Sequence, residues 1–304
     1  MAERKIPIKI QRDTDEKESI SDESDENDQS NKMSQTMEQL AIKPGTKQKK
    51  LSIQIKSSQE NMVNQKYLRE YDVFEDRSKG TLFNGNVREK IILAIDRAQD
   101  ENCTPFMTEK SKFTPLSMFR RSLHLFLKLK HLINKDNEFA LVVLNENSAK
   151  WHLNFTNDLR KLNQEIERIT QCDVEDTFNM NNLLQEISHH VQVPETDSDE
   201  IAPTFVIRTI LLYGRSYTIP VYKPDINIET ILKKPYFYFD VLFTHEPVDR
   251  SNNCNNIFEA LQSLDKKGLS YFFPVCRDTR RLHNSMAKLL AHPLQRPIQK
   301  LHKF

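Results

Sequence analysis

Glycine is scarce in this sequence, with five residues among 304. The spacing of these five excludes the G-x-G-x-x-G loop of dinucleotide-binding proteins. Gly80 and Gly85 form a G-x-x-x-x-G pattern, but Asn86-Val87 follows where a P-loop requires lysine and a hydroxyl residue. The standard loops that hold nucleotide phosphates are therefore absent from the sequence.

Cysteine and long apolar runs are also limited. The four cysteines lie far apart and form no C-x-x-C pair, which argues against a zinc cluster or a disulfide framework and favours a reducing compartment. Residues 1–10 lack the apolar core of a secretory signal, and no stretch approaches the roughly 18 apolar residues that span a bilayer. We therefore expect a soluble intracellular protein with no membrane partner.

Neither charge sign is in excess. The sequence has 44 basic and 43 acidic residues, so its net charge is +1, and we expect no direct binding to nucleic acid. With 38% hydrophobic and 29% charged residues, the chain is too polar for one fully packed globule. This composition predicts a core domain plus disordered sequence.

Residues 1–80 have the composition expected of a disordered acidic and polar tail. Asp13–Asp28 contains nine acidic residues, and a basic cluster follows at Lys47–Lys50. Such a segment cannot bury enough apolar surface to offset its ordering entropy. Two short alternating stretches, ending at Ile10 and Ile55, are either chance apolar residues or segments that add to the edge of a partner's sheet.

From residue 87 onward, apolar runs alternate with amphipathic stretches. This alternation predicts one α/β domain over 87–292, with a doubly wound, mostly parallel sheet. The expected buried strands are Ile91–Ile95, Phe139–Leu144, Phe205–Tyr213, Tyr236–Phe243 and Ser270–Cys276, with Trp151–Phe155 as a short edge strand. The expected helices are Pro115 to about Asn134, one beginning at Asn157 or Asp158, Asn181–His190, Asn256–Leu264, and one from Asp278 or Thr279 to about His292.

The end of the first strand is the position where open α/β sheets bind ligands. Von Willebrand A domains hold Mg²⁺ there with the pattern D-x-S-x-S, and this chain has Asp96, Ala98 and Asp100 at the matching positions. Both hydroxyl residues are missing, and Gly214-Arg215-Ser216 stands at another strand end where an acidic ligand is common. We interpret Asp96, Ala98 and Asp100 as a degenerate metal site that binds no metal. A cation-dependent ligand-binding module is the alternative.

Motifs for catalysis are missing as well. The sequence contains no G-x-S-x-G and no H-E-x-x-H motif. Among the cysteines, Cys276 alone has a basic neighbour in the sequence, Arg277, and one adjacent charge is weak support for a nucleophile. We therefore expect no catalytic residue, no cofactor and no enzymatic activity.

Two features suit contact with another protein. A basic stripe with spacings of four and three is expected on the helix that begins at Pro115. It is either the ordinary solvated face of an amphipathic helix, which is the favoured interpretation, or a surface for an acidic partner or the chain's own acidic tail. Its members are Arg120, His124, Lys128, His131 and Lys135.

The second feature is the proline-rich stretch 293–304, which follows the last expected helix and is either a docking peptide or a simple tail that ends the helix. We expect Pro293, Leu294, Arg296 and Pro297 to bind a partner. Truncation after Ala291 is then expected to weaken that binding and to leave the domain folded.

Several strings resemble a known protein family over about residues 87–297. The family consists of the von Willebrand A-like scaffold subunits that are shared by two deubiquitinase assemblies, BRISC and the BRCA-one A complex. The similar strings are EFALVV at Glu138–Val143, VIRTIL at Val206–Leu211, PYFYFDV at Pro235–Val241, SLDKKG at Ser263–Gly268, and MAKLLAHPLQRP at Met286–Pro297.

The resemblance implies a non-catalytic adaptor whose A-type domain has lost its metal site. It implies direct binding to the BRE-like subunit, which has ubiquitin-conjugating-enzyme-variant folds, with Pro293 and Arg296 anchored in a groove of that subunit. A JAMM zinc isopeptidase, specific for chains joined through lysine sixty-three of ubiquitin, and its Abraxas-type partner belong to the same complex. The resemblance also implies nuclear and cytoplasmic locations and a role in DNA-damage signalling.

The family's tail can carry a tankyrase-binding motif of the type R-x-x-P-x-G. Here the matching stretch Arg4–Lys9 ends in lysine instead of glycine. This departure puts tankyrase binding in doubt.

Overall fold

The computed structural model describes residues 74–75, 87–101, 103–195, 202–223 and 225–300. All of these belong to one compact unit, Lys56–Phe304. The expected disordered tail lies outside the described residues except for Phe74–Glu75. None of the described helices is long and apolar enough to cross a bilayer.

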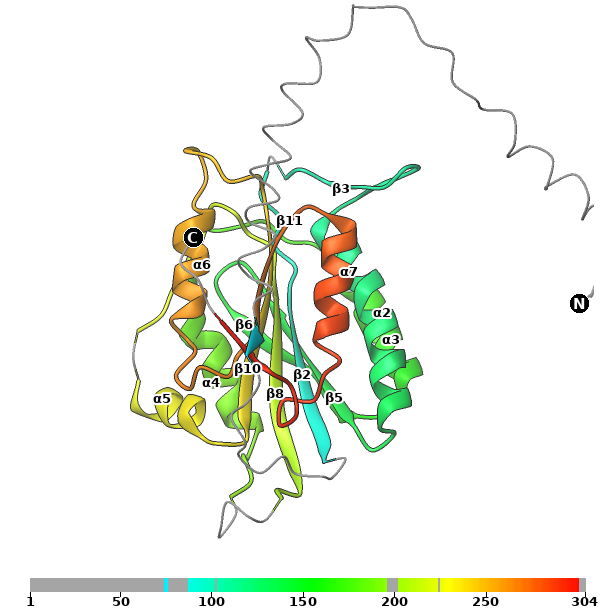
Figure 1. Cartoon of the computed structure of the whole chain (residues 1–304). Helices are drawn as coiled ribbons and strands as arrows, with labels where there is room; N and C mark the ends of the chain where they lie inside the picture. The colour runs from blue at the N-terminus through cyan, green and yellow to red at the C-terminus, as the bar shows by residue number, and fades with distance from the viewer. Residues whose placement is uncertain (1–73, 76–86, 102, 196–201, 224, 301–304) are drawn as a thin grey trace, which may run out of the picture. The chain divides into compact units, whose positions relative to one another are not determined.

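A six-stranded sheet forms the centre of the domain (Figure 1). Its strand order is β11-β10-β8-β2-β5-β6, and every neighbouring pair is parallel except β5 with β6. The bounds are β2 Arg88–Asp96, β5 Glu138–Leu144, β6 Ala149–Thr156, β8 Phe205–Tyr213, β10 Phe237–His245 and β11 Phe272–Cys276. This topology is the von Willebrand A-like, doubly wound arrangement, and it confirms the predicted fold class.

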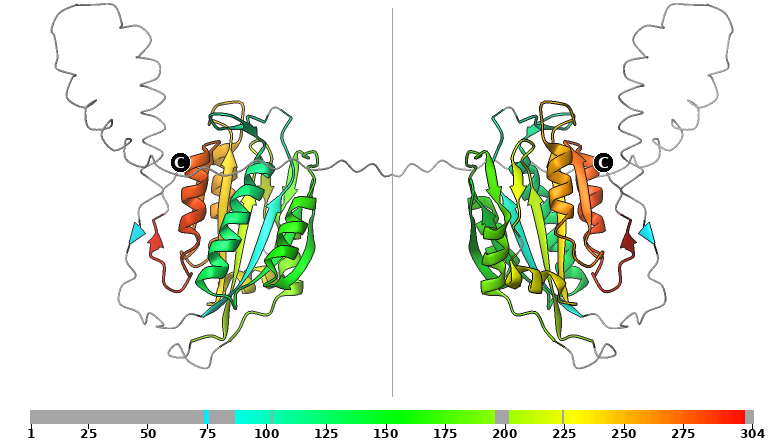
Figure 2. Two further views of the ribbon diagram at one scale, coloured as in Figure 1. Left: turned by 90° about the vertical axis from the view of Figure 1, so that its right-hand side faces the viewer. Right: turned by 90° about the vertical axis from the view of Figure 1, so that its left-hand side faces the viewer.

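Helices cover both faces of the sheet, because each central strand is apolar on both sides (Figure 1). One face packs against α2 Pro115–Ile133, α3 Leu159–Arg168 and α7 Thr279–Lys288, with α2 between the other two (Figure 2). The opposite face packs against α4 Met180–His190, α5 Ile226–Lys233 and α6 Cys254–Gln262.

Short strands pair outside the main sheet. Three two-stranded pairs are formed by β1 Phe74–Glu75 with β12 Ile298–Gln299, β3 Phe106–Met107 with β4 Lys112–Phe113, and β7 Thr177–Asn179 with β9 Ile219–Val221. The first pair places residues from both ends of the described chain on the domain. The folded part therefore includes 74–75 and 293–300, beyond the expected limits of 87 and 292.

The sequence correctly predicted the main strands and the presence of five of the helices, and it missed α5. The last helix, α7, ends at Lys288 and not at about His292 as expected. The predicted edge strand is confirmed as β6, whose side chains alternate between partly buried and exposed. Ile226–Lys233 was missed because its stretch is short and follows directly after Pro224-Asp225.

The start of α3 offers a local test of the fold. Asp158 caps this helix, since its Oδ1 accepts hydrogen bonds from the backbone N–H groups of Arg160 at 2.9 Å and Lys161 at 3.1 Å. Asp158→Ala should lower the free energy of unfolding by about 1 kcal/mol, measured by urea denaturation. Asp158→Asn is the control and should retain most of the stability. Equal losses in the two variants would contradict a capping role.

Candidate functional site

The carboxyl ends of β2 and β8 meet at the point where metal-binding A domains hold their cation. The Asp96 side chain lies at this point with 1% of its residue surface exposed. Its carboxylate accepts hydrogen bonds from the backbone N–H groups of Ala98 and Gly214, each at 3.2 Å. The structure thus brings together the end of the first strand and the loop after β8, as the sequence predicted.

An arginine supplies the positive charge at this point. The Arg215 guanidinium donates to both carboxylate oxygens of Asp96, through Nε at 3.2 Å and Nη2 at 3.1 Å. It also donates to the backbone carbonyls of Asn145 and Glu146, and it lies 4.5 Å from the centre of the Phe178 ring. Burial alone would lower the pKa of Arg215, but the Asp96 carboxylate raises it, so the guanidinium stays charged.

The remaining residues of the motif do not complete a cation site. Ala98 has no oxygen in its side chain, and Asp100 binds the backbone N–H of Ser216 at 2.8 Å through Oδ2. Burial raises the pKa of Asp100. Among the described residues, no group of three or more His, Cys, Asp or Glu side chains could hold a metal ion. The residues present therefore do not fit Mg²⁺, because Arg215 already takes both oxygens of Asp96.

A second arginine forms an ion pair at the ends of the neighbouring strands. Arg277, which follows β11 and has a positive φ of 47°, pairs with Glu246 at 3.1 Å. The same guanidinium donates to Thr244 Oγ1 at 3.2 Å and to the Gly214 carbonyl at 3.4 Å. Internal ion pairs thus occupy the strand ends of β2, β8, β10 and β11.

The cysteine thiols are not activated. Burial is the main cause that raises the pKa of Cys103 and Cys172 to about 11 and that of Cys254 to about 12. Burial also raises the pKa of Cys276, although the Arg277 charge opposes it. A thiol nucleophile needs a lowered pKa, so this environment argues against one.

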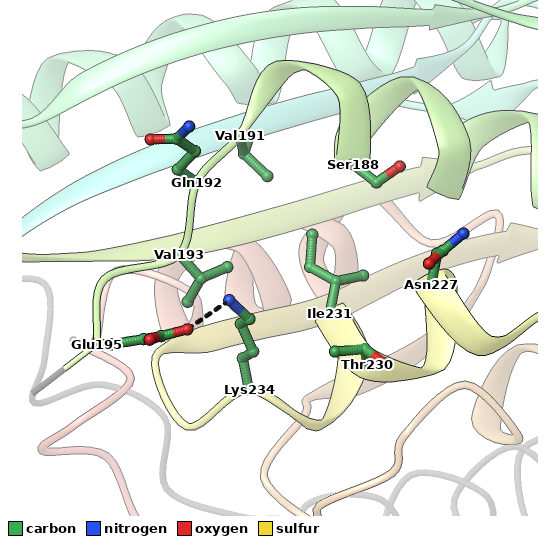
Figure 3. Close-up of a pocket in the computed structure, with 9 residues that line it drawn as sticks. All are labelled: Ser188, Val191, Gln192, Val193, Glu195, Asn227, Thr230, Ile231 and Lys234. Carbon is green, nitrogen blue, oxygen red and sulfur yellow. Dashed lines mark hydrogen bonds and ion pairs between the residues drawn. The ribbon is translucent and has the colours of Figure 1, made fainter.

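A surface pocket lies between the end of α4 and α5 (Figure 3). Its lining includes Val191, Val193 and Ile231, together with an ion pair between Lys234 and Glu195 at 2.9 Å. The pocket contains no pairing of a nucleophile with a base. It therefore offers no recognisable chemistry.

The proline-rich segment lies against its own domain. Pro293 and Leu294 are buried, and the Arg296 residue is 1% exposed. Its guanidinium forms a two-pronged ion pair with Asp240 of β10, with Nη1–Oδ2 at 2.7 Å and Nη2–Oδ1 at 2.6 Å. The guanidinium also stacks 3.9 Å from the centre of the Tyr271 ring.

Asp240 has a second arginine, Arg208 of β8, whose Nε donates at 2.7 Å. Burial alone would raise the pKa of Asp240, but Arg296 and Arg208 together hold it below its usual value. Arg208 also reaches Glu89 of β2 at 3.3 Å, and Glu89 pairs with Lys130 of α2. The chain after α7 joins this network, because the Leu289 carbonyl accepts from Arg208 and the Leu290 carbonyl accepts from Lys130.

The same segment covers the free edge of the sheet. The Gln299 side chain accepts from the Phe272 N–H at 2.7 Å and donates to the Phe272 carbonyl at 3.0 Å, as a neighbouring strand would. Tyr271 donates its hydroxyl to the Pro297 carbonyl at 2.7 Å. The backbone of edge strand β11 is therefore partly satisfied within the chain.

This placement corrects the expectation for Arg296. We expected its side chain to anchor the segment in a partner's groove, but its charge is already neutralised inside the domain. The reason is that Asp240, buried in the sheet, needs counter-charges of its own. Partner contact stays a prediction for Pro297, which is exposed, whereas Pro293 and Leu294 are buried as Arg296 is.

The basic stripe of α2 also has a different setting from the one expected. Arg120 donates to the Ile169 carbonyl, and His124 binds Glu167 at 2.7 Å, so both face α3 and its C-terminal end. Lys128 and Lys135 are exposed. Arg120 and His124 are therefore already bound within the domain, and Lys135 lies beyond the end of α2.

Comparison with known proteins finds that this chain is similar to proteins named BRISC and BRCA1-A complex member 1. BRISC and BRCA1-A complex member 1 of Xenopus tropicalis is 35% identical over 219 residues, which cover 70% of this chain and 68% of that protein. The human protein of that name is 35% identical over 225 residues, covering 70% of this chain and 67% of the relative. The chain belongs to this family. No family model matches the sequence.

The chain spans only part of some relatives. The match to the Danio rerio protein, 34% identical, covers 70% of this chain and 59% of the relative. Among solved structures, the VWA domain of SpRpn10 is 13% identical with a TM-score of 0.42, covering 68% of this chain and 97% of that domain. Membership of this family confirms the resemblance that was inferred from the short sequence strings.

The Asp96–Arg215 pair predicts a specific pattern of stability. Arg215→Met leaves a buried carboxylate without its counter-charge, which should lower the free energy of unfolding by about 3–5 kcal/mol. The double variant Asp96→Asn with Arg215→Met removes both charges and should recover much of that loss. Urea denaturation measures both. A double variant no more stable than Arg215→Met would contradict charge neutralisation as the reason for the pair.

The buried position of Arg296 reverses the expectation for the C-terminal segment. Arg296→Met should lower the free energy of unfolding by about 3 kcal/mol, since Arg208 remains beside Asp240. Truncation after Ala291 should be at least as damaging, whereas we expected it to leave the fold intact. Arg280→Met, at an exposed position on α7, is the matched control and should change stability by less than about 0.5 kcal/mol. Equal stability of Arg296→Met and Arg280→Met would contradict the internal anchor.

Proposed function

We propose that this chain is a non-catalytic scaffold subunit of a BRISC-type or BRCA-one A-type deubiquitinase assembly. Its membership of the complex-member family is the observation that carries the proposal. The relatives are named as members of a complex, so the function proposed here is association with other proteins.

The interior of the domain supports a non-catalytic role. Arg215 and Arg277 fill the strand ends where this fold class binds ligands. The thiols have raised pKa values, so a cysteine nucleophile is disfavoured. The alternative, a cation-dependent ligand-binding module, is disfavoured because Asp96 is already neutralised by Arg215.

The partners in this proposal follow from the resemblance. A BRE-like subunit binds the chain directly, and a JAMM zinc isopeptidase with its Abraxas-type partner completes the assembly. The zinc chemistry then resides in the isopeptidase, which cleaves ubiquitin chains joined through lysine sixty-three. We infer that the chain acts in the cytoplasm and nucleus, where such assemblies serve ubiquitin and DNA-damage signalling.

The proposal predicts what accompanies the protein in its own cells. Affinity purification of the tagged full-length chain from native extract, followed by mass spectrometry, should recover a BRE-like subunit and a JAMM isopeptidase. The Arg296→Met variant tests whether assembly needs the intact fold, and Arg250→Met, at an exposed position outside α2 and α7, serves as its control. Recovery of the full-length chain without either partner would contradict the scaffold function.

A further inference from the structure

The outer face of α2 carries a row of exposed apolar side chains. Leu125 is 50% exposed, Leu132 is 65% exposed and Ile133 is 53% exposed. Leu129 lies between them and is partly buried. Leu125, Leu129 and Leu132 follow one another at spacings of four and three, so they lie in one row along the helix.

A groove between α2 and α7 continues this row. Leu125 and Leu129 line it from α2, Met286 and Ala287 line it from α7, and Leu290 lines it from the turn that follows α7. The two helices pack side by side on the same face of the sheet (Figure 2). Together the row and the groove form an apolar surface, which we call the α2–α7 surface.

The charged side chains within α2 and α7 have one sign. Neither α2 nor α7 contains an aspartate or a glutamate. Arg121 and Lys128 are exposed on α2, and Arg280 is exposed on α7. An acidic partner is attracted to such a rim, whereas two copies of this chain would repel each other face to face.

An exposed apolar residue on another helix offers a comparison. Ile226, on α5, is 85% exposed, but it stands at the start of its helix between Asp225 and Asn227. Single exposed apolar residues are common on soluble proteins and need no partner. Ile226 is therefore a suitable control position on the opposite face of the sheet.

We propose that the α2–α7 surface binds an amphipathic helix of a partner protein, with acidic residues flanking its apolar face. A third helix fits here because apolar side chains from two packed helices line the groove, and spacings of three and four residues match their rows. The acidic flanks of that helix contact Arg121, Lys128 and Arg280. The proposal rests on the scaffold function and assigns it a contact surface.

Binding by point variants of the full-length chain tests the surface. The double variant Leu125→Asp with Leu132→Asp places negative charge on the row and should weaken binding to the purified BRE-like subunit of the same organism by about tenfold or more. Ile226→Asp is the matched control and should bind as the unaltered chain does. Urea denaturation of both variants checks that each is folded, which is expected because the altered side chains are at least half exposed.

A photo-crosslinking residue in place of Leu132 identifies what lies on the surface. In the reconstituted complex, the cross-linked peptide should be helical and acidic, with apolar residues at spacings of three and four. A cross-link to a basic peptide or to a strand would overturn the proposed occupant, as would a link to a second copy of this chain. Lys128→Glu should also weaken binding. A stronger complex with that variant would overturn the proposal that acidic residues flank the apolar face of the partner helix.

The outcomes separate this inference from the function on which it rests. If the unaltered chain binds the BRE-like subunit and the leucine double variant binds equally well, the α2–α7 surface is overturned and the scaffold function stands. If the unaltered chain does not bind that subunit, the scaffold function and the surface assigned to it both fail.

Discussion

A carboxylate that is buried in the sheet must find its counter-charge inside the chain, and much of this structure follows from that constraint. Asp96 meets Arg215 at the end of β2, and Asp240 meets Arg208 and Arg296 on β10, the strand beside the edge strand β11. The first pair fills the position of a cation. The second holds the chain after α7 against the domain, which in turn places Gln299 beside the open edge of β11.

The buried ion pairs determine which parts of the domain can bind other molecules. Arg215 and Arg277 neutralise the carboxylates of Asp96 and Glu246 at the strand ends. The C-terminal segment, which has the composition of a docking peptide, is instead a structural element whose arginine is buried. Partner contact then depends on outer surfaces, and the apolar groove between α2 and α7 is the surface we assign to it.

The sequence predicted the main sheet well because its strands carry a strong signal. Phe205–Tyr213 was predicted with the bounds that β8 has in the structure, since a nine-residue apolar run is typical of a strand covered on both faces. The degenerate motif at Asp96, Ala98 and Asp100 was also placed at the correct strand end. Short strands such as β1 and β12 were missed, because two residues carry no periodic pattern.

The charge network was missed because its members lie far apart in the sequence. A signal did exist: Arg208 and Asp240 each interrupt an otherwise apolar strand, and a charge in such a strand requires an opposite charge nearby. Their pairing across β8 and β10 was therefore within reach of sequence reasoning. The pairing of Arg296 with Asp240 could not be predicted from the sequence, because proline-rich composition is equally typical of a buried segment and an exposed one.

Calorimetric titration of the full-length chain with Mg²⁺ tests most directly whether Arg215 takes the place of a cation. The account predicts no saturable heat at neutral pH, because both oxygens of Asp96 are bound to the guanidinium. Saturable binding that is lost in Asp96→Ala would contradict the account, since it would mean that the strand-end carboxylate still serves a metal ion.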